Sequence, residues 1–233
     1  MMDALIPLFT LIVLEVILGI DNIIFISILA DKLPEENRDK LRYWGIGLAL
    51  IMRLLLLAVI SWILKLDTTL FTILDIDFSG KSLILLFGGI FLLYKSTKEI
   101  YHNTEQRDQL EPQIKGKLNF NRMLGEIIIL DLVFSVDSII TAVGMVSELW
   151  IMYTAVTVTV VIMLIASKPI SKFISDHPSF KILALSFLLM IGVTLIAEGL
   201  SFHIPKGYIY FSMAFAFLVD FLQMKTLGKK ATS

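Results

Sequence analysis

The fold is decided by the stretch Leu14-Glu15-Val16-Ile17-Leu18-Gly19-Ile20-Asp21-Asn22-Ile23-Ile24, which places two carboxylates inside an apolar run long enough to cross a membrane. The chain repeats this pattern as Leu130-Asp131-Leu132-Val133-Phe134-Ser135-Val136-Asp137-Ser138-Ile139-Ile140. In both copies the acids stand six residues apart, and Asn22 is matched by Ser138, another neutral oxygen donor. The repetition predicts two equivalent membrane helices that face each other.

The composition indicates a membrane protein. The chain is 57% hydrophobic and its mean hydropathy is +0.83. Its apolar residues gather in blocks of about 17 to 27, the length that spans the hydrocarbon core. We therefore predict an all-α fold, a polytopic transmembrane helical bundle of about seven spans. The expected spans are Ala4–Ala30, Tyr43–Leu64, Phe78–Ile100, Leu124–Val146, Trp150–Pro169, Phe180–Leu200 and Tyr208–Met224.

The placement of basic residues predicts the orientation of the chain in the bilayer. Of the 20 Lys and Arg residues, 16 fall on the side shared by the first, third and fifth connections and the C-terminus. Only Lys65, Lys81 and Lys206 fall on the opposite side, and Arg53 lies inside the second span. Because basic loops stay in the cytoplasm, we expect the N-terminus outside and the C-terminus in the cytoplasm.

The spacing of the two acidic segments predicts an inverted repeat. They open spans one and four, so each repeat has three spans, and an odd number makes the second repeat enter from the opposite side. In the fainter remainder of the match, Glu99 is paired with Glu198. The expected domains are a first three-helix repeat (1–102), a cytoplasmic linker (103–122), an inverted second repeat (123–203), and a seventh helix with a cytoplasmic tail (204–233).

Four carboxylates at membrane depth need compensation, since each costs about 2.5–3.5 kcal/mol at the centre of a spanning helix. They must be protonated, paired with a cation or bound to a metal. Arg53 is the only basic residue deep in a span, and one arginine does not neutralise four acids. The predicted metal ligands are Glu15, Asp21, Asn22, Asp131, Asp137 and Ser138, and the predicted counter-ion or coupling residues are Arg53, Glu99 and Glu198.

The helical geometry sets a condition on this site. In a straight helix Glu15 and Asp21 lie about 120° apart around the axis and about 9 Å along it. They converge only if the helix opens between them, and Gly19 is the expected break. Ser135 holds the equivalent position in the second copy, where its hydroxyl can bend a helix by bonding to a backbone carbonyl.

The ligand chemistry favours a hard cation. All candidate ligands are oxygens, which suits manganese, magnesium or calcium better than zinc or copper. The ion is expected as a transported substrate, with no cofactor permanently bound. Two alternatives stay open: the polar residues could hold helices together, or the acids could relay protons. The role of Arg53 is left open as well, because it could be a fixed counter-ion or a moving gate.

The acidic motifs, together with the run Ala197-Glu198-Gly199-Leu200-Ser201-Phe202-His203-Ile204-Pro205-Lys206-Gly207-Tyr208-Ile209-Tyr210-Phe211, resemble the TerC family of bacterial integral membrane proteins. The resemblance covers nearly the whole chain. It implies a multi-pass protein of the bacterial inner membrane that exports metal ions, with manganese as the favoured substrate. In some members it implies manganese loading of exported metalloenzymes beside the secretion machinery. It assigns Glu15, Asp21 and Asn22 to the first family motif, and Asp131, Asp137 and Ser138 to the second.

We therefore expect an exporter of divalent cations that works by alternating access around the acidic site, with proton exchange at the same carboxylates. The alternative is a non-transporting membrane partner in a secretion-linked metalation complex or a tellurite and metal-stress resistance complex. The partners expected are the metal ion, the lipid bilayer and the secretion machinery, and no nucleic acid. No catalytic motif of a hydrolase, metalloprotease or nucleotide-binding enzyme is found, so no enzyme activity is expected.

Overall fold

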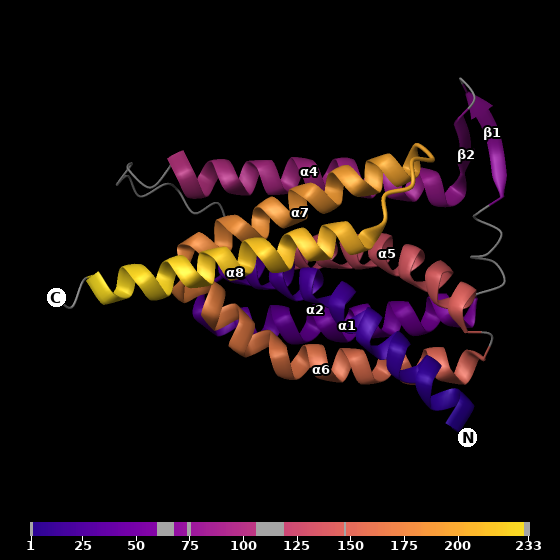
Figure 1. The fold of residues 1–233 in the computed structure, drawn as a ribbon, viewed down its shortest axis with the longest axis horizontal. Helices are drawn as coiled ribbons and strands as arrows, with labels where there is room; N and C mark the ends of the chain where they lie inside the picture. The colour runs from indigo at the N-terminus through magenta and orange to yellow at the C-terminus, as the bar shows by residue number, and fades with distance from the viewer. Residues whose placement is uncertain (1, 60–67, 74–75, 106–118, 147, 231–233) are drawn as a thin grey trace.

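The computed structural model describes residues 2–59, 68–73, 76–105, 119–146 and 148–230 (Figure 1). These residues form seven helices and one antiparallel hairpin, which confirms the all-α bundle. Six of the helices, all except α4, are long and apolar enough to span a membrane. The elements are α1 (Met2–Ala30), α2 (Glu35–Ala58), β1 (Thr69–Ile73), β2 (Ile76–Ser79), α4 (Gly80–Glu105), α5 (Phe120–Met145), α6 (Leu149–Asp176), α7 (Pro178–Gly199) and α8 (Lys206–Lys230).

The helix ends differ from the predicted spans where local sequence extends a helix beyond its apolar run. Helix α2 begins at Glu35, directly after Pro34, and acids in its first turn favour a helix start. Helix α6 continues past Pro169 to Asp176, and Pro178 then opens α7. The predicted end of the second span beyond Val59, and residues 106–118 of the predicted linker, lie outside the described residues.

The hairpin β1–β2 was not predicted. Thr72 is paired with Asp77 across the two strands, and the Phe71 and Phe78 rings stack with their centroids 5.3 Å apart. The third span was expected to begin at Phe78, but this residue is in β2 and α4 begins at Gly80. The two strands have only 5 and 4 residues, and apolar runs precede and follow the hairpin. An alternation of apolar and polar residues is therefore too short to predict a strand here.

The expected breaks in the acidic helices are wrong. Helix α1 is continuous through Gly19, and α5 is continuous through Ser135. A Cβ on Gly19 would lie 2.9 Å from the sulfur of Met163 on α6, so this glycine allows two helices to approach closely. Ser135 donates to the Asp131 carboxylate rather than to a backbone carbonyl.

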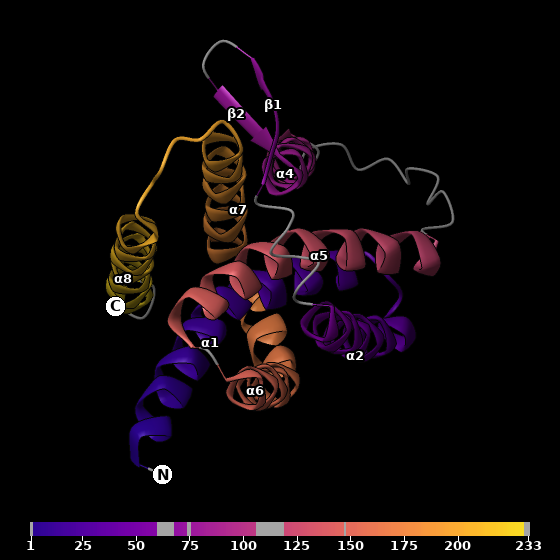
Figure 2. The same cartoon turned by 90° about the vertical axis from the view of Figure 1, so that its right-hand side faces the viewer.

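Helices α4 and α7 pack as a close pair beside the group formed by α1, α2, α5 and α6 (Figure 2). Their contact is reciprocal: a Cβ on Gly89 would lie 2.7 Å from the Gly192 carbonyl oxygen, and a Cβ on Gly192 would lie 3.1 Å from the Gly89 oxygen. Gly88 meets Val133 of α5 in the same way. The pair Gly88-Gly89 therefore serves close helix packing.

Some of the helix contacts follow the pattern that an inverted repeat predicts. In an inverted repeat, α1 is equivalent to α5, α2 to α6, and α4 to α7. The contact between α1 and α6 is then equivalent to the contact between α5 and α2, and both contacts are present. The contacts of α4 with α7 and of α2 with α6 map onto themselves. The exact domain boundaries stay a prediction.

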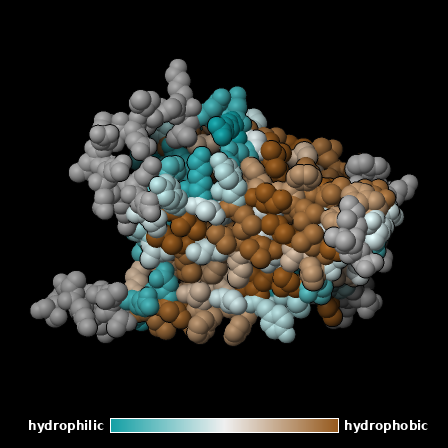
Figure 3. Space-filling model, turned by 90° about the horizontal axis from the view of Figure 1, so that it is seen from above, coloured by the Kyte–Doolittle hydropathy of each residue, from teal (hydrophilic) through white to brown (hydrophobic). Residues whose placement is uncertain are grey.

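The outer surface carries a broad apolar band, brown in Figure 3, with polar residues toward its edges. Side chains such as Phe87, Ile165 and Phe211 are more than 70% exposed. Helix α8 contributes much of this surface because it packs mainly against α7. Such a surface suits contact with lipid.

Candidate ion-binding site

One arginine joins the two acidic helices inside the bundle. Arg53 of α2 donates from Nη1 to Glu15 Oε2 of α1 at 2.9 Å, and from Nη2 to Asp131 Oδ1 of α5 at 2.8 Å. Its Nε lies 3.2 Å from the same Asp131 oxygen. The three side chains are at most 5% exposed. The sequence therefore predicted correctly that Arg53 is deep in the bundle and that Glu15 and Asp131 come together.

Neutral polar groups complete this cluster. Asn22 donates from Nδ2 to Asp131 Oδ1 at 3.2 Å, and Ser135 donates to Asp131 Oδ2 at 3.2 Å. The Ser138 hydroxyl donates to the Ser135 carbonyl at 3.3 Å. With both carboxylates ionised, the cluster carries one net negative charge, since a single guanidinium faces two acids.

The other two acids lie apart from this cluster. Asp137 forms ion pairs with Lys206 at the start of α8 and with Lys81 of α4, the latter at 3.9 Å. Asp21 is buried, and its Oδ1 has no hydrogen-bond partner in the described structure. Both follow from the unbroken helices, which turn Asp21 away from Glu15 and Asp137 away from Asp131. Among the described residues, no three His, Asp or Glu side chains are grouped closely enough to hold a metal ion.

Comparison with known proteins identifies the family. The model of the integral membrane protein TerC family matches residues 2–231. The chain belongs to the TerC family. It is 48% identical to a UPF0053 protein of Haemophilus influenzae, over 96% of this chain and 94% of the relative. It is also 54% identical to the UPF0053 inner membrane protein YoaE and 49% identical to the UPF0053 protein YegH, both of Escherichia coli K12.

The TerC chain spans only part of the two Escherichia coli relatives. The match covers 91% and 92% of this chain, and 41% of each of those proteins. No solved structure matches this TerC chain. The geometry of the site therefore comes from the structure described here alone.

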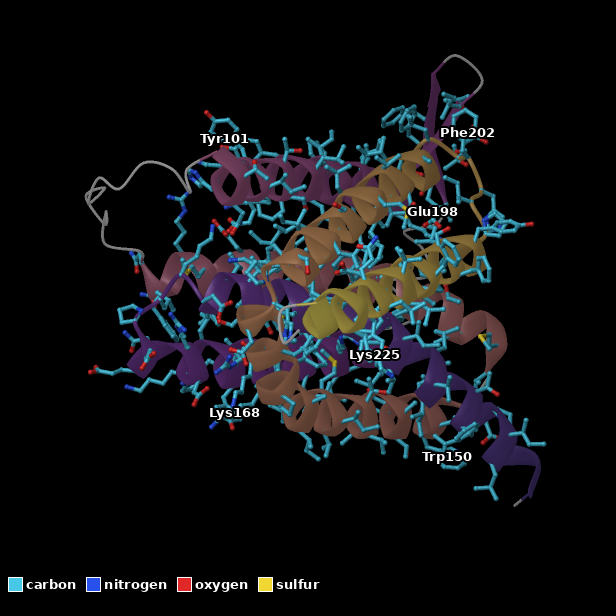
Figure 4. All side chains as sticks on the ribbon, turned by 60° about the vertical axis from the view of Figure 1, so that its left-hand side comes forward. Tyr101, Trp150, Lys168, Glu198, Phe202 and Lys225 are labelled. Atoms are coloured by element: carbon cyan, nitrogen blue, oxygen red, sulfur yellow. The ribbon has the colours of Figure 1, made fainter. Side chains whose placement is uncertain are left out.

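Two cavities of this TerC chain are lined by described residues at opposite ends of the bundle. The first, which we call the hairpin-end cavity, has a volume of about 470 Å³ and contains Asp137, Glu198, Lys81 and Lys206 in its wall. Glu198 lies on α7 near the turn that leads to α8 (Figure 4). Asp137 thus faces a cavity beside the β-hairpin, whereas the Arg53 cluster is enclosed.

The second, the linker-end cavity, has a volume of about 560 Å³ and lies where α4 ends and α5 begins. Glu99 is in its wall and forms an ion pair with Lys32. Glu99 and Glu198 are therefore at opposite ends of this TerC bundle. The predicted match of Glu99 with Glu198 also differs from the helix contact. Gly89 and Gly192 meet at equivalent positions of α4 and α7. Lys95 and Glu198 each lie six residues after these glycines, so Glu198 corresponds to Lys95 rather than to Glu99.

Thr159 was missed by sequence reasoning. It is fully buried on α6, and its hydroxyl has no hydrogen-bond partner in the described structure. Helices α1 and α6 run in the same direction (Figure 1). Thr159 precedes Met163 by one turn of α6, and Glu15 precedes Gly19 by one turn of α1. Because Met163 and Gly19 are in contact, Thr159 lies at the level of Glu15. Nothing distinguishes it in sequence from the other threonines of this apolar helix.

Lys206 was also missed as a partner of the site. The sequence placed it in an outer loop, and its charge served only to predict orientation. In the structure it reaches Asp137, which is 69 residues away along the chain. Asp220 was missed as well: it lies within α8, and its Oδ2 is buried without a hydrogen-bond partner in the described structure. No sequence periodicity predicts the contact of Lys206 or the burial of the Asp220 oxygen.

Proposed function

We propose that this chain exports a divalent metal cation across the bacterial inner membrane, with manganese as the favoured ion. The observation that carries the proposal is the enclosed pair Glu15 and Asp131, one from each repeat, held by a single arginine. Carboxylate, amide and hydroxyl oxygens surround the pair, and these are the ligands that hard cations prefer. The relative YoaE is named an inner membrane protein, which supports a location in that membrane. The basic connections support a cytoplasmic C-terminus.

Arg53 acts in this proposal as an exchangeable positive charge. Two buried carboxylates without a cation strongly destabilise the folded protein, so they need a positive partner in every state of the cycle. When the site is free of cargo, Arg53 supplies that charge. A divalent cation that displaces the guanidinium leaves the pair Glu15 and Asp131 neutralised, and the return of Arg53 favours release.

Access to the site would alternate between the two ends of the bundle. The pair α4 and α7 is tied to the other helices by ion pairs at both ends. At the hairpin end, Lys81 of α4 contacts Asp137 of α5. At the linker end, Lys32 in the turn after α1 contacts Glu99 of α4, and Lys95 of α4 contacts Glu126 of α5. Breaking one set while keeping the other would open one cavity toward the acids.

Asp21 and Asp137 would then act as stations between the cavities and the enclosed pair. Asp137 faces the hairpin-end cavity. Asp21 lies six residues beyond Glu15 on α1, and its Oδ1 has no hydrogen-bond partner in the described structure. Protonation of these carboxylates would oppose metal binding, and this couples the ion to protons.

Flux through reconstituted vesicles tests the proposal. Vesicles that contain the purified protein and a manganese-sensitive dye should show manganese entry. We expect Glu15→Gln and Asp131→Asn to reduce the rate at least tenfold each, whereas Asp176→Asn, at an exposed acid at the end of α6, should leave it unchanged. Absence of flux from the unmodified protein, or full flux from the double variant, would refute the proposed export.

A further inference from the structure

The linker-end cavity has the size and lining of a binding site for a small molecule. Its volume of about 560 Å³ is within the range typical of ligand pockets. Apolar side chains of α1, α5 and α7 form one part of its wall, including Leu29, Met123 and Leu185. Charged side chains of α4, of α5 and of the turn after α1 form the other part. The cavity therefore offers both an apolar and a polar surface.

The charged part of this wall has an excess of positive charge. It contains Lys32, Lys95, Lys98 and Arg122, but only the acids Glu99 and Glu126. Lys32 is paired with Glu99.

Lys95 and Arg122 share Glu126, so one carboxylate faces two cations there. Lys98 has no carboxylate partner in the part of the chain that the structure describes, and its ammonium lies over the Tyr94 ring. Two positive charges are thus uncompensated.

The adjoining connection carries no net charge. The segment 105–118 contains three acidic residues, Glu105, Asp108 and Glu111, and three basic residues, Arg107, Lys115 and Lys117. It therefore leaves the excess of positive charge at this end of the chain unchanged, and an anion from outside the chain would compensate it.

Ser96 provides a second, independent observation. It is 1% exposed and lies in the wall of this cavity, yet its hydroxyl has no hydrogen-bond partner in the described structure. Other helix serines donate to the carbonyl four residues earlier, as Ser27, Ser186 and Ser212 do. A buried hydroxyl without a partner is unfavourable, so its position beside the cavity indicates a ligand that accepts this hydrogen bond.

We propose that the linker-end cavity binds the phosphate group of an anion, which is either free phosphate or the headgroup of an anionic phospholipid. A phosphate group accepts hydrogen bonds from lysine, arginine and serine at the same time, and its charge matches the excess in the cavity. Basic pockets between helices on the cytoplasmic side suit lipid headgroups, and the apolar wall suits an acyl chain. The site lies apart from Glu15 and Asp131, so the inference does not depend on metal export.

Binding to the purified full chain tests this inference. Isothermal titration with inorganic phosphate in a neutral detergent measures the free anion. Native mass spectrometry after exchange into phosphatidylglycerol or phosphatidylcholine measures retained lipid. Lys98→Gln removes a cation without a carboxylate partner, and Ser96→Ala removes a hydroxyl without a hydrogen-bond partner. Glu126→Gln removes a negative charge and so makes the cavity more positive. Lys172→Gln is the control, because Lys172 is exposed on α6 at the same end of the bundle and outside the cavity.

We expect the unmodified protein to retain phosphate or phosphatidylglycerol but not phosphatidylcholine. Lys98→Gln and Ser96→Ala should each weaken binding about tenfold, the equivalent of one hydrogen bond to a charged group. Glu126→Gln should strengthen binding, and the control should not change it. Binding of phosphate without lipid identifies the free anion, and the reverse identifies the headgroup. Retention of neither probe, or equal retention by Lys98→Gln, Ser96→Ala and the unmodified protein, would overturn the inference.

Discussion

Arg53 holds Asp131 with two nitrogen atoms, Nε at 3.2 Å and Nη2 at 2.8 Å from the same carboxylate oxygen. Its third contact, from Nη1, is with Glu15. The guanidinium thus occupies the space between the acids of α1 and α5. Under the proposed export, a divalent cation that binds both carboxylates would have to compete with this guanidinium.

The first prediction concerns the loss of this guanidinium. Arg53→Gln leaves two buried carboxylates without a cation, and we expect it to reduce the free energy of unfolding by about 3–5 kcal/mol. Manganese should restore part of the loss, because a ligand at a hundred times its dissociation constant stabilises by about 2.7 kcal/mol. Thermal unfolding in detergent, with and without manganese, measures both effects.

The informative comparison is the difference between variants in their response to manganese. Lys172→Gln, which removes an exposed charge, should unfold at the same temperature as the unmodified protein. If Arg53→Gln gained no more from manganese than this control does, the guanidinium would not be competing with the ion, and Arg53 would be a fixed counter-ion only.

The second prediction concerns the contact between the third helices of the two repeats. Gly89→Ala places a methyl group against the Gly192 carbonyl, where no flexible side chain can move aside. Overpacking of this kind costs about 1–3 kcal/mol, and we expect a corresponding fall in unfolding temperature. Gly47→Ala is the matched control, since nothing lies within 4 Å of its added Cβ and alanine favours a helix. Equal unfolding temperatures for the two variants would argue against a close α4–α7 contact.

The sequence was sufficient to predict the helical bundle and the core of the site. Acids buried in apolar runs need compensation, so Glu15, Asp131 and Arg53 could be expected inside the bundle, but the pairing of Arg53 with these two acids was not predicted. The repeat spacing predicted which helices would be equivalent.

The arrangement of the remaining ligands could not be predicted. A glycine within a helix permits either a bend or close packing, and the choice at Gly19 depends on Met163, which lies far along the chain. The partners of Asp137 come from α4 and α8, whose positions no local pattern reveals.

The third prediction tests the ion pair at the linker end. The chain contains no cysteine, so introduced pairs can be cross-linked without background. Lys32→Cys with Glu99→Cys places one thiol in the turn after α1 and one on α4. We expect a reducible bis-methanethiosulfonate cross-linker to stop manganese flux in vesicles, and reduction to restore it. Thr72→Cys with Asp77→Cys is the control, because these residues are paired within the hairpin and their cross-link restrains no helix pair. Full flux through the cross-linked Lys32 and Glu99 variant would exclude a moving linker end.

The fourth prediction concerns Thr159, whose hydroxyl is buried without a partner at the level of Glu15. Thr159→Val removes the hydroxyl at nearly constant volume, and the loss of an unsatisfied polar group should raise the free energy of unfolding by about 1–3 kcal/mol. If the hydroxyl is an oxygen ligand of the bound ion, the same variant should raise the KM for manganese about tenfold. Thr157→Val is the control, since Thr157 is exposed and donates to the Tyr153 carbonyl. A Thr159→Val protein that is more stable but transports with an unchanged KM would place the hydroxyl outside the ion's coordination.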